Sequence, residues 1–189
     1  MALKATICKA SLQISDVDRA YYHTHQLTIA RHPSETEERM MLRLLMYALY
    51  ASPHLLFGKG ISTDDEPDLW EKRDNGDIER WVDLGQPDEK RIRRAAGRAR
   101  HVVILSYGGA AAEHWWEKNK QRFSRFRNLK ILNAPVELST QLAQLAQRNM
   151  ELQCMMSDGV WFGDENKQIE AQLTTWQDDS ATQDTATPG

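Results

Sequence analysis

Two aspartates on either side of a tight turn are the residues of this chain best suited to metal chemistry. Asn75-Gly76 lies midway between Asp68 and Asp83, and Asn-Gly is a strong hairpin signal because both central positions of a type I′ turn need positive φ. With these two residues as the loop, Asp68 falls opposite Asp83 on one face of the hairpin. Like charges facing each other in a sheet are destabilising. The pair therefore either lies at a solvated end of the hairpin or holds a divalent cation such as Mg²⁺.

The same register predicts the rest of the hairpin. It gives four further cross-strand pairs: Leu69/Val82, Trp70/Trp81, Glu71/Arg80 and Lys72/Glu79. The residues that follow, Gln86-Pro87-Asp88-Glu89, are typical of a helix start with Pro87 at the first helical position.

That helix is strongly basic. In and just after it, residues 90–100 carry six basic side chains and no acid. A second basic cluster further along the chain, residues 118–130, carries six more. Local basic clusters bind phosphates whatever the total charge, although they are also common as solvated helix faces.

Length and composition indicate a soluble globular protein. The chain has 189 residues, a net charge of −3 and 41% hydrophobic residues, and it contains no apolar run near the roughly 20 residues of a membrane span. The N-terminus has no signal-peptide architecture, and the two cysteines fit no metal spacing. We expect a cytoplasmic protein with a single globular domain over residues 1–176 and a disordered polar tail over residues 177–189.

The order of predicted elements indicates an α+β fold, with a mixed β-sheet flanked by helices, an N-terminal hairpin and additional C-terminal strands. Strands are expected at 2–15, 21–30, 101–107, 129–133, 150–156, 160–162 and 169–176, besides those of the central hairpin. Helices are expected at 34–51, 87–99, 110–126 and 135–148. The first helix begins with a capping box of Ser34 and Glu37. One residue later, Glu38 is either an ordinary first-turn acid or a carboxylate that leans towards the aspartate pair.

Three stretches carry a resemblance to a known family: HPSETEERMMLRLL, DEPDLWEKRDNGDIERWVDLGQPDEKRIRRA and LSYGGAAAEHWW. Through them most of the chain resembles the YaeQ family, and through that family the PD-(D/E)xK nuclease superfamily. The resemblance implies a restriction-endonuclease-like core. It also implies that Asp68 and Asp83 hold Mg²⁺ (or Mn²⁺) and that Glu38 is an assisting helix acid.

One position departs from the superfamily pattern. The resemblance places a lysine two residues after the second acid, where it orients the attacking water, but this chain has Gly85 there. Lys90, one turn into the next helix, is a candidate for a migrated lysine, and Lys72 on the hairpin is another. Gln86 is a candidate for positioning water or phosphate.

Two functions follow from these residues. The first is a Mg²⁺-dependent nuclease acting on DNA or RNA, with Arg91, Arg94 and Arg98 contacting the backbone. The alternative is a catalytically inactive nuclease-like fold that binds nucleic acid or a protein partner. Motifs of nucleotide-binding, serine-hydrolase and zinc-protease chemistry are absent from the sequence.

Overall fold

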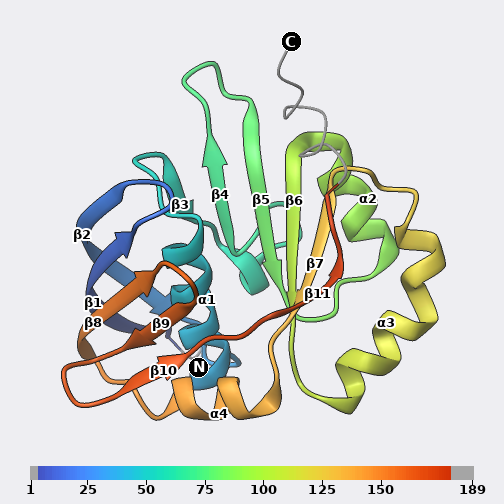
Figure 1. Ribbon diagram of the computed structural model, residues 1–189. Helices are drawn as coiled ribbons and strands as arrows, with labels where there is room; N and C mark the ends of the chain where they lie inside the picture. Colours follow the sequence, from blue (N-terminus) through green and yellow to red (C-terminus); the bar gives the residue numbers. More distant parts are fainter. Residues whose placement is uncertain (1–3, 180–189) are drawn as a thin grey trace. The chain divides into compact units, whose positions relative to one another are not determined.

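The computed structural model describes residues 4–179, which divide into two compact units. The first unit takes the chain up to Ala51 and again Val136–Gln172, and the second takes Ser52–Pro135 and the chain from Leu173. Each unit has its own β-sheet (Figure 1). The described residues form four α-helices: α1 (Glu37–Leu49), α2 (Glu89–Arg98), α3 (Ala110–Phe123) and α4 (Val136–Ala143).

The α+β class with mixed sheets, an N-terminal hairpin and additional C-terminal strands is confirmed. The single domain expected over residues 1–176 stays a prediction. Within residues 4–179, no helix is both long enough and apolar enough to cross a lipid bilayer.

The sheet of the first unit is built on the N-terminal hairpin and has the strand order β10-β9-β8-β1-β2. Its strands are β1 (Thr6–Asp16), β2 (Tyr21–Arg31), β8 (Asn149–Met156), β9 (Val160–Gly163) and β10 (Gln168–Glu170). β1 and β2 are antiparallel, whereas β8 joins β1 in parallel, with Lys9 opposite Asn149. Every second residue of β8 is buried, which is the pattern of a strand with one solvated face.

α1 begins later than the sequence predicted. Its N-cap is Thr36, whose hydroxyl accepts a hydrogen bond from the Arg39 N–H at 3.2 Å. The capping box at Ser34 is wrong, because Ser34 lies in the preceding turn and its hydroxyl contacts the ring of His32. Residues 39–48 are all buried, so the helix has no solvent-facing side beyond its first turn.

The sheet of the second unit has the order β11-β7-β6-β5-β4-β3. Its strands are β3 (Leu55–Phe57), β4 (Leu69–Lys72), β5 (Ile78–Leu84), β6 (Ala99–Ser106), β7 (Leu129–Asn133) and β11 (Thr174–Gln177). β5, β6 and β7 are parallel and are joined by α2 and α3, which lie beside β6 and β7 in Figure 1. Parallel neighbours need such crossover helices.

α2 and α3 pack on one face of this sheet. Ile92 and Ala95 of α2 and Phe123 of α3 join Trp81 of β5 in a single buried cluster. Because side chains alternate along a strand, Asp83 lies on the same face as Trp81, the face that α2 covers. The fold therefore brings the basic helix over the second aspartate.

The β4–β5 hairpin keeps the predicted register next to the aspartates. Three predicted pairs are present: Leu69/Val82, Trp70/Trp81 and Glu71/Arg80. Closer to the turn a bulge shifts the ladder, so Lys72 faces Ile78 and not Glu79.

The turn of this hairpin differs from the predicted type I′. The Gly76 N–H donates to the Arg73 carbonyl at 2.9 Å, and Gly76 has a φ of +89°. Asn75 does not have positive φ, since Ala20 is the only such non-glycine residue in the described part of the chain. The loop therefore closes around three residues, and the bulge absorbs the extra one.

The last predicted strand, at 169–176, is two strands that belong to different sheets. β10 pairs with β9 in the first unit, and β11 pairs with β7 in the second.

The predicted tail also begins too early. The Gln177 side chain donates to the Phe123 carbonyl at 3.0 Å, and buried Asp179 contacts the ring of His101 at 2.8 Å. Residues 180–189 of that tail lie outside the described residues.

Candidate functional site

Asp68 and Asp83 lie side by side, as the hairpin register predicted. The Asp68 N–H donates to Asp83 Oδ1 at 3.3 Å, and the Leu84 N–H donates to Asp68 Oδ2 at 2.8 Å. Both residues are buried, at 2% and 3% exposure. The alternative of a solvated hairpin end is therefore wrong, and the pair needs a compensating positive charge.

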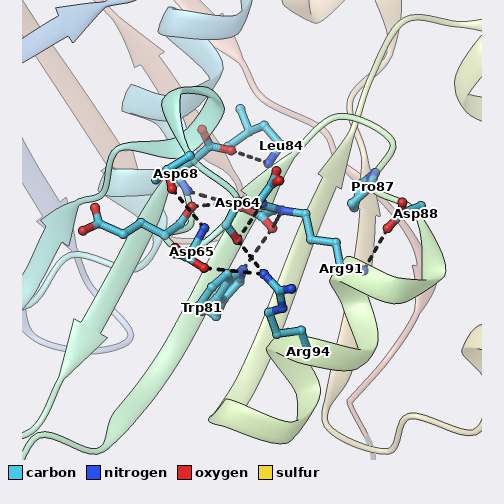
Figure 2. A network of polar contacts seen from close by, with 12 residues as sticks. Asp64, Asp65, Asp68, Trp81, Leu84, Pro87, Asp88, Arg91 and Arg94 are labelled. Carbon is cyan, nitrogen blue, oxygen red and sulfur yellow. Dashed lines mark hydrogen bonds and ion pairs between the residues drawn. The ribbon is translucent and has the colours of Figure 1, made fainter.

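Arg91 supplies that charge from the first turn of α2. Its Nε donates to Asp83 Oδ2 at 2.8 Å and its Nη2 donates to Asp83 Oδ1 at 3.1 Å, which makes a bidentate pair. Asp88 caps the helix by accepting the Arg91 N–H at 2.8 Å, and this hydrogen bond fixes the position of the Arg91 backbone (Figure 2). The hydrogen bond to Asp83 and the charges of Asp83, Asp68 and Asp64 raise the pKa of Arg91, although burial opposes this.

These contacts decide whether a divalent cation fits. A carboxylate has about four lone-pair sites. In Asp83, Oδ1 accepts from Arg91 and from the Asp68 N–H, while Oδ2 accepts from Arg91 and from Trp81 Nε1 at 2.9 Å. Across residues 4–179, no group of three or more His, Cys, Asp or Glu residues is placed to hold a metal ion. As arranged, Asp83 has no oxygen lone pair left for a Mg²⁺ ion, so the pair would fit one only if some of these hydrogen bonds broke.

The backbone conformation at position 85 disfavours a lysine there. Gly85 has a φ of +103°, and its N–H donates to the Leu105 carbonyl at 2.9 Å. This left-handed conformation is strained for a residue with a side chain. The turn from β5 towards α2 therefore favours glycine at position 85, where the sequence resemblance led us to expect lysine.

The two lysine candidates lie elsewhere. Lys90 is exposed and lines a cavity between α2 and α3. It is one residue before Arg91, so its side chain leaves the helix about 100° away. Lys72 places its ammonium group over the Trp70 ring, 3.6 Å from the centroid. It is therefore Arg91, and neither lysine, that reaches the aspartate pair.

The other two predicted catalytic residues are also placed. Gln86 Nε2 donates to the Tyr107 carbonyl at 2.6 Å and to Ser106 Oγ at 3.2 Å, which ties the start of the α2 segment to the end of β6. Glu38 lies in the first turn of α1, in the first unit, and is half-buried. The catalytic roles of both residues stay predictions.

Arg91, Arg94 and Arg98 form one row along α2 and reach the loop before β4. Arg91 Nη2 donates to the Glu66 carbonyl at 3.0 Å, and Arg98 Nη1 donates to the Asp65 carbonyl at 3.1 Å. Figure 2 shows Arg91 and Arg94 extending from α2 towards Asp64 and Asp65. The row predicted to contact nucleic acid is thus engaged by an acidic loop of the protein itself.

The neighbouring face of α2 is open. Lys90 and Arg93 line a cavity of about 650 Å³ together with Lys118 and Arg122 of α3. The cavity is also lined by Gln86, Asp88, Glu89, Ala111, His114, Trp115 and Asn119. Four basic side chains therefore surround this space against two acidic ones, and we call it the α2–α3 cavity.

Both acids of the cavity are already engaged. Asp88 is the N-cap of α2. Glu89 accepts a hydrogen bond from Arg93 at 3.0 Å, pairs with Arg125, and lies 3.7 Å from Arg122. The hydrogen bond from Arg93 and the charges of Arg125 and Arg122 hold the pKa of Glu89 below its usual value. Positive charge is therefore in excess around this carboxylate.

Comparison with known proteins places the chain in a family. The sequence profile described as "YaeQ protein" matches residues 1–173. The chain belongs to the YaeQ family. It is 43% identical over 181 residues to the "Uncharacterized protein YaeQ" of Escherichia coli (strain K12), an alignment that covers 95% of this chain and all of the relative.

Two solved structures of YaeQ proteins have the same fold. The crystal structure of the protein from Xanthomonas axonopodis pv. citri is similar with a TM-score of 0.87 and 45% identity, over 92% of this chain and 98% of that one. The structure from Pseudomonas syringae is similar with a TM-score of 0.88 and 36% identity, over 93% of this chain and 98% of that one. The YaeQ resemblance of the sequence is thereby confirmed.

Of the residues that line the cavity of this YaeQ chain, the sequence singled out Lys90 and Gln86, but as catalytic candidates; Arg93, Lys118 and Arg122 were noted only as members of basic clusters. Lys90/Arg93 and Lys118/Arg122 are spaced three and four residues apart, so each pair lies on one helix face. That spacing was a usable signal. α2 has two basic faces. Only the folded structure shows that the acidic loop covers the face of Arg91, Arg94 and Arg98 and leaves the face of Lys90 and Arg93 open.

Proposed function

We propose that this protein binds the phosphate backbone of nucleic acid through the α2–α3 cavity, without a resident metal ion. The observation that carries the proposal is the excess of basic side chains around an open space of about 650 Å³. Within the described residues, the ammonium groups of Lys90 and Lys118 make no ion pair. They are therefore available to phosphate oxygens at little desolvation cost.

The saturated Asp83 carboxylate supports a binding role over a catalytic one. Arg91 occupies the hydrogen-bonding sites of Asp83 that a metal would need. The pair then acts as a structural anchor that fixes α2 on the sheet, and so presents Lys90 and Arg93 to the cavity. On this reading the chain keeps a nuclease-like arrangement and uses it to bind.

Salt dependence measures this interaction directly. Binding of a fluorescent DNA duplex, followed by anisotropy at several salt concentrations, should give a slope of log K against log salt of about −3.6 if four phosphates are contacted. Lys90→Gln/Arg93→Gln should reduce the slope by about 2, one for each contact. The matched control is Arg94→Gln/Arg98→Gln, which removes two charges from the loop-facing row of the same helix.

The control separates two arrangements. If only the control pair reduced the slope, the nucleic acid would lie on the arginine row predicted from the sequence, and the cavity proposal would fail. A flat salt response in the wild type would reject backbone binding altogether and would favour a protein partner.

A Mg²⁺-dependent nuclease is the second candidate, and the adjacency of two buried carboxylates favours it. It requires Arg91 to leave Asp83. Plasmid, single-stranded DNA and RNA should therefore be incubated with Mg²⁺ or Mn²⁺ and with wild type, Arg91→Ala or Asp83→Ala. Cleavage by wild type that Asp83→Ala abolishes would establish the nuclease and overturn the metal-free proposal.

A further inference from the structure

A second cavity of the same unit combines aromatic rings with basic side chains. It measures about 490 Å³ and lies between the C-terminal half of α3 and β11. Its lining residues include Trp116, Lys120, Phe126, Arg127, Trp176 and Asp178, and we call it the tryptophan cavity. The volume is within the range of about 300–1,000 Å³ that is usual for small-molecule sites.

Two indole rings form its aromatic wall. Trp116 of α3 and Trp176 of β11 stack with centroids 5.7 Å apart and planes 14° apart. Both rings pack on the core cluster and are only partly buried, and Phe126 is a third partly buried ring in the wall. A rigid aromatic wall of this kind suits a flat heteroaromatic ring, because stacking needs no side-chain reordering.

The charges around the rings suit an anion. Lys120 and Arg127 line the cavity against one acid, Asp178, whose carboxylate lies 3.8 Å from Lys130 Nζ. Lys120 pairs with Glu117 at 2.7 Å, but both side chains are exposed, at 45% and 64%. Such exposed pairs contribute little and exchange readily with solvent or ligand. The cavity therefore offers stacking and a phosphate contact together.

The partial burial of the three rings favours a small planar group over a broad protein surface. None of the cavity's aromatic residues is among the large exposed hydrophobic side chains of the described residues. A base that is not paired in a duplex can splay out and stack on such partly buried rings.

We propose that the tryptophan cavity takes one nucleotide of single-stranded nucleic acid, with its base on the indole wall and its phosphate at Lys120 and Arg127. The cavity is distinct from the α2–α3 cavity, which uses other residues of α3. The inference thus adds a base-binding site to the proposed backbone site. It predicts a preference for single strands over duplexes.

The test compares a labelled oligothymidine with a duplex of the same length by fluorescence anisotropy. Trp176→Leu should weaken binding of the single strand about 5- to 150-fold, the equivalent of 1–3 kcal/mol per stacked base, and should leave duplex binding unchanged. Lys120→Gln, at an exposed position that does not endanger folding, should weaken single-strand binding less. Lys9→Gln, in the other unit, removes one exposed charge as the matched control.

The possible results of these binding measurements distinguish the base-binding site from its alternatives. Equal losses for single strand and duplex, or unchanged single-strand affinity in both cavity variants, would overturn the base-binding site. Duplex binding that still depended on Lys90 and Arg93 would leave the backbone site standing in that case. A dimer in sedimentation that Trp176→Leu abolished, with DNA affinity unchanged, would assign the cavity to a second copy of the chain.

Discussion

Replacing Arg91 by alanine should destabilise the protein, because it leaves a buried charge without its partner. The Asp83 side chain is 4% exposed, and Arg91 supplies two of its four hydrogen bonds. Removing one partner of a buried ion pair costs about 3–5 kcal/mol. Arg91 is itself 22% exposed, and Asp83 keeps the N–H groups of Trp81 and Asp68. We therefore expect a loss of about 3 kcal/mol, the lower end of that range.

Urea unfolding at neutral pH, followed by circular dichroism, measures this loss as a change in the free energy of unfolding. The matched control is Lys90→Ala, one residue earlier on the same helix, which should change stability by less than about 0.5 kcal/mol. The double variant Arg91→Ala/Asp83→Asn removes the buried charge as well, so its loss should be smaller than the sum of the two single losses by about 1 kcal/mol or more. If Arg91→Ala were as stable as Lys90→Ala, the pair would be solvated, and the lone-pair argument against a metal ion would be refuted.

Three further predictions concern other parts of the chain. Burial raises the pKa of Tyr47 to about 12, so an ultraviolet titration should show a late tyrosine step near that pH that Tyr47→Phe removes. The stability that the neutral phenol contributes is full below the unfolded pKa of 10.0 and is lost as the pH rises to about 12. Burial also raises the pKa of the Cys154 thiol to about 12, so a thiol reagent should label it only after unfolding, and rapid labelling of the native protein, absent in Cys154→Ala, would contradict this. Gly85→Lys should cost about 1–3 kcal/mol through its positive φ alone, since an added Cβ meets no atom within 4 Å; an unchanged urea midpoint would show that the turn relaxes.

The hairpin illustrates what local sequence determines. Alternation and the position of Asn75-Gly76 gave the pairing of Trp70 with Trp81 and the adjacency of the two aspartates. The turn type did not follow, because a three-residue loop with a compensating bulge satisfies the same outer register as a two-residue loop.

The choice between Lys90 and Arg91 illustrates what local sequence leaves open. Adjacent helix positions point about 100° apart, so the residue that reaches the acids depends on how α2 is rotated over the sheet. That rotation follows from the turn at Gly85 and from the packing of Ile92 and Ala95 on the core cluster. The spacing of Ile92, Ala95 and Ala96 does mark the buried face of α2. It does not show which acid of the sheet lies beside that face, because that depends on contacts between residues far apart in the sequence.

The cavities depend on still more distant residues. The α2–α3 cavity brings Lys90 together with Lys118, and the tryptophan cavity brings Trp116 together with Trp176. The second pair depends on β11 joining the sheet of the second unit, whereas β10 belongs to the sheet of the first. The alternation of Ile169, Ala171 and Leu173 with polar residues is typical of one strand that continues to Trp176, so the local pattern concealed the change of sheet.

The parallel pairing of β1 with β8 has a consequence for how the chain folds as it is synthesised. The N-terminal hairpin leaves the ribosome long before its parallel neighbour, since the whole inserted segment 52–135 is translated in between. Non-local parallel pairing is slow, and an unpaired strand edge invites association with other chains. Until β8 has been synthesised, one edge of β1 in the nascent hairpin therefore stays unpaired. Chaperone binding or aggregation during translation would occur in that interval.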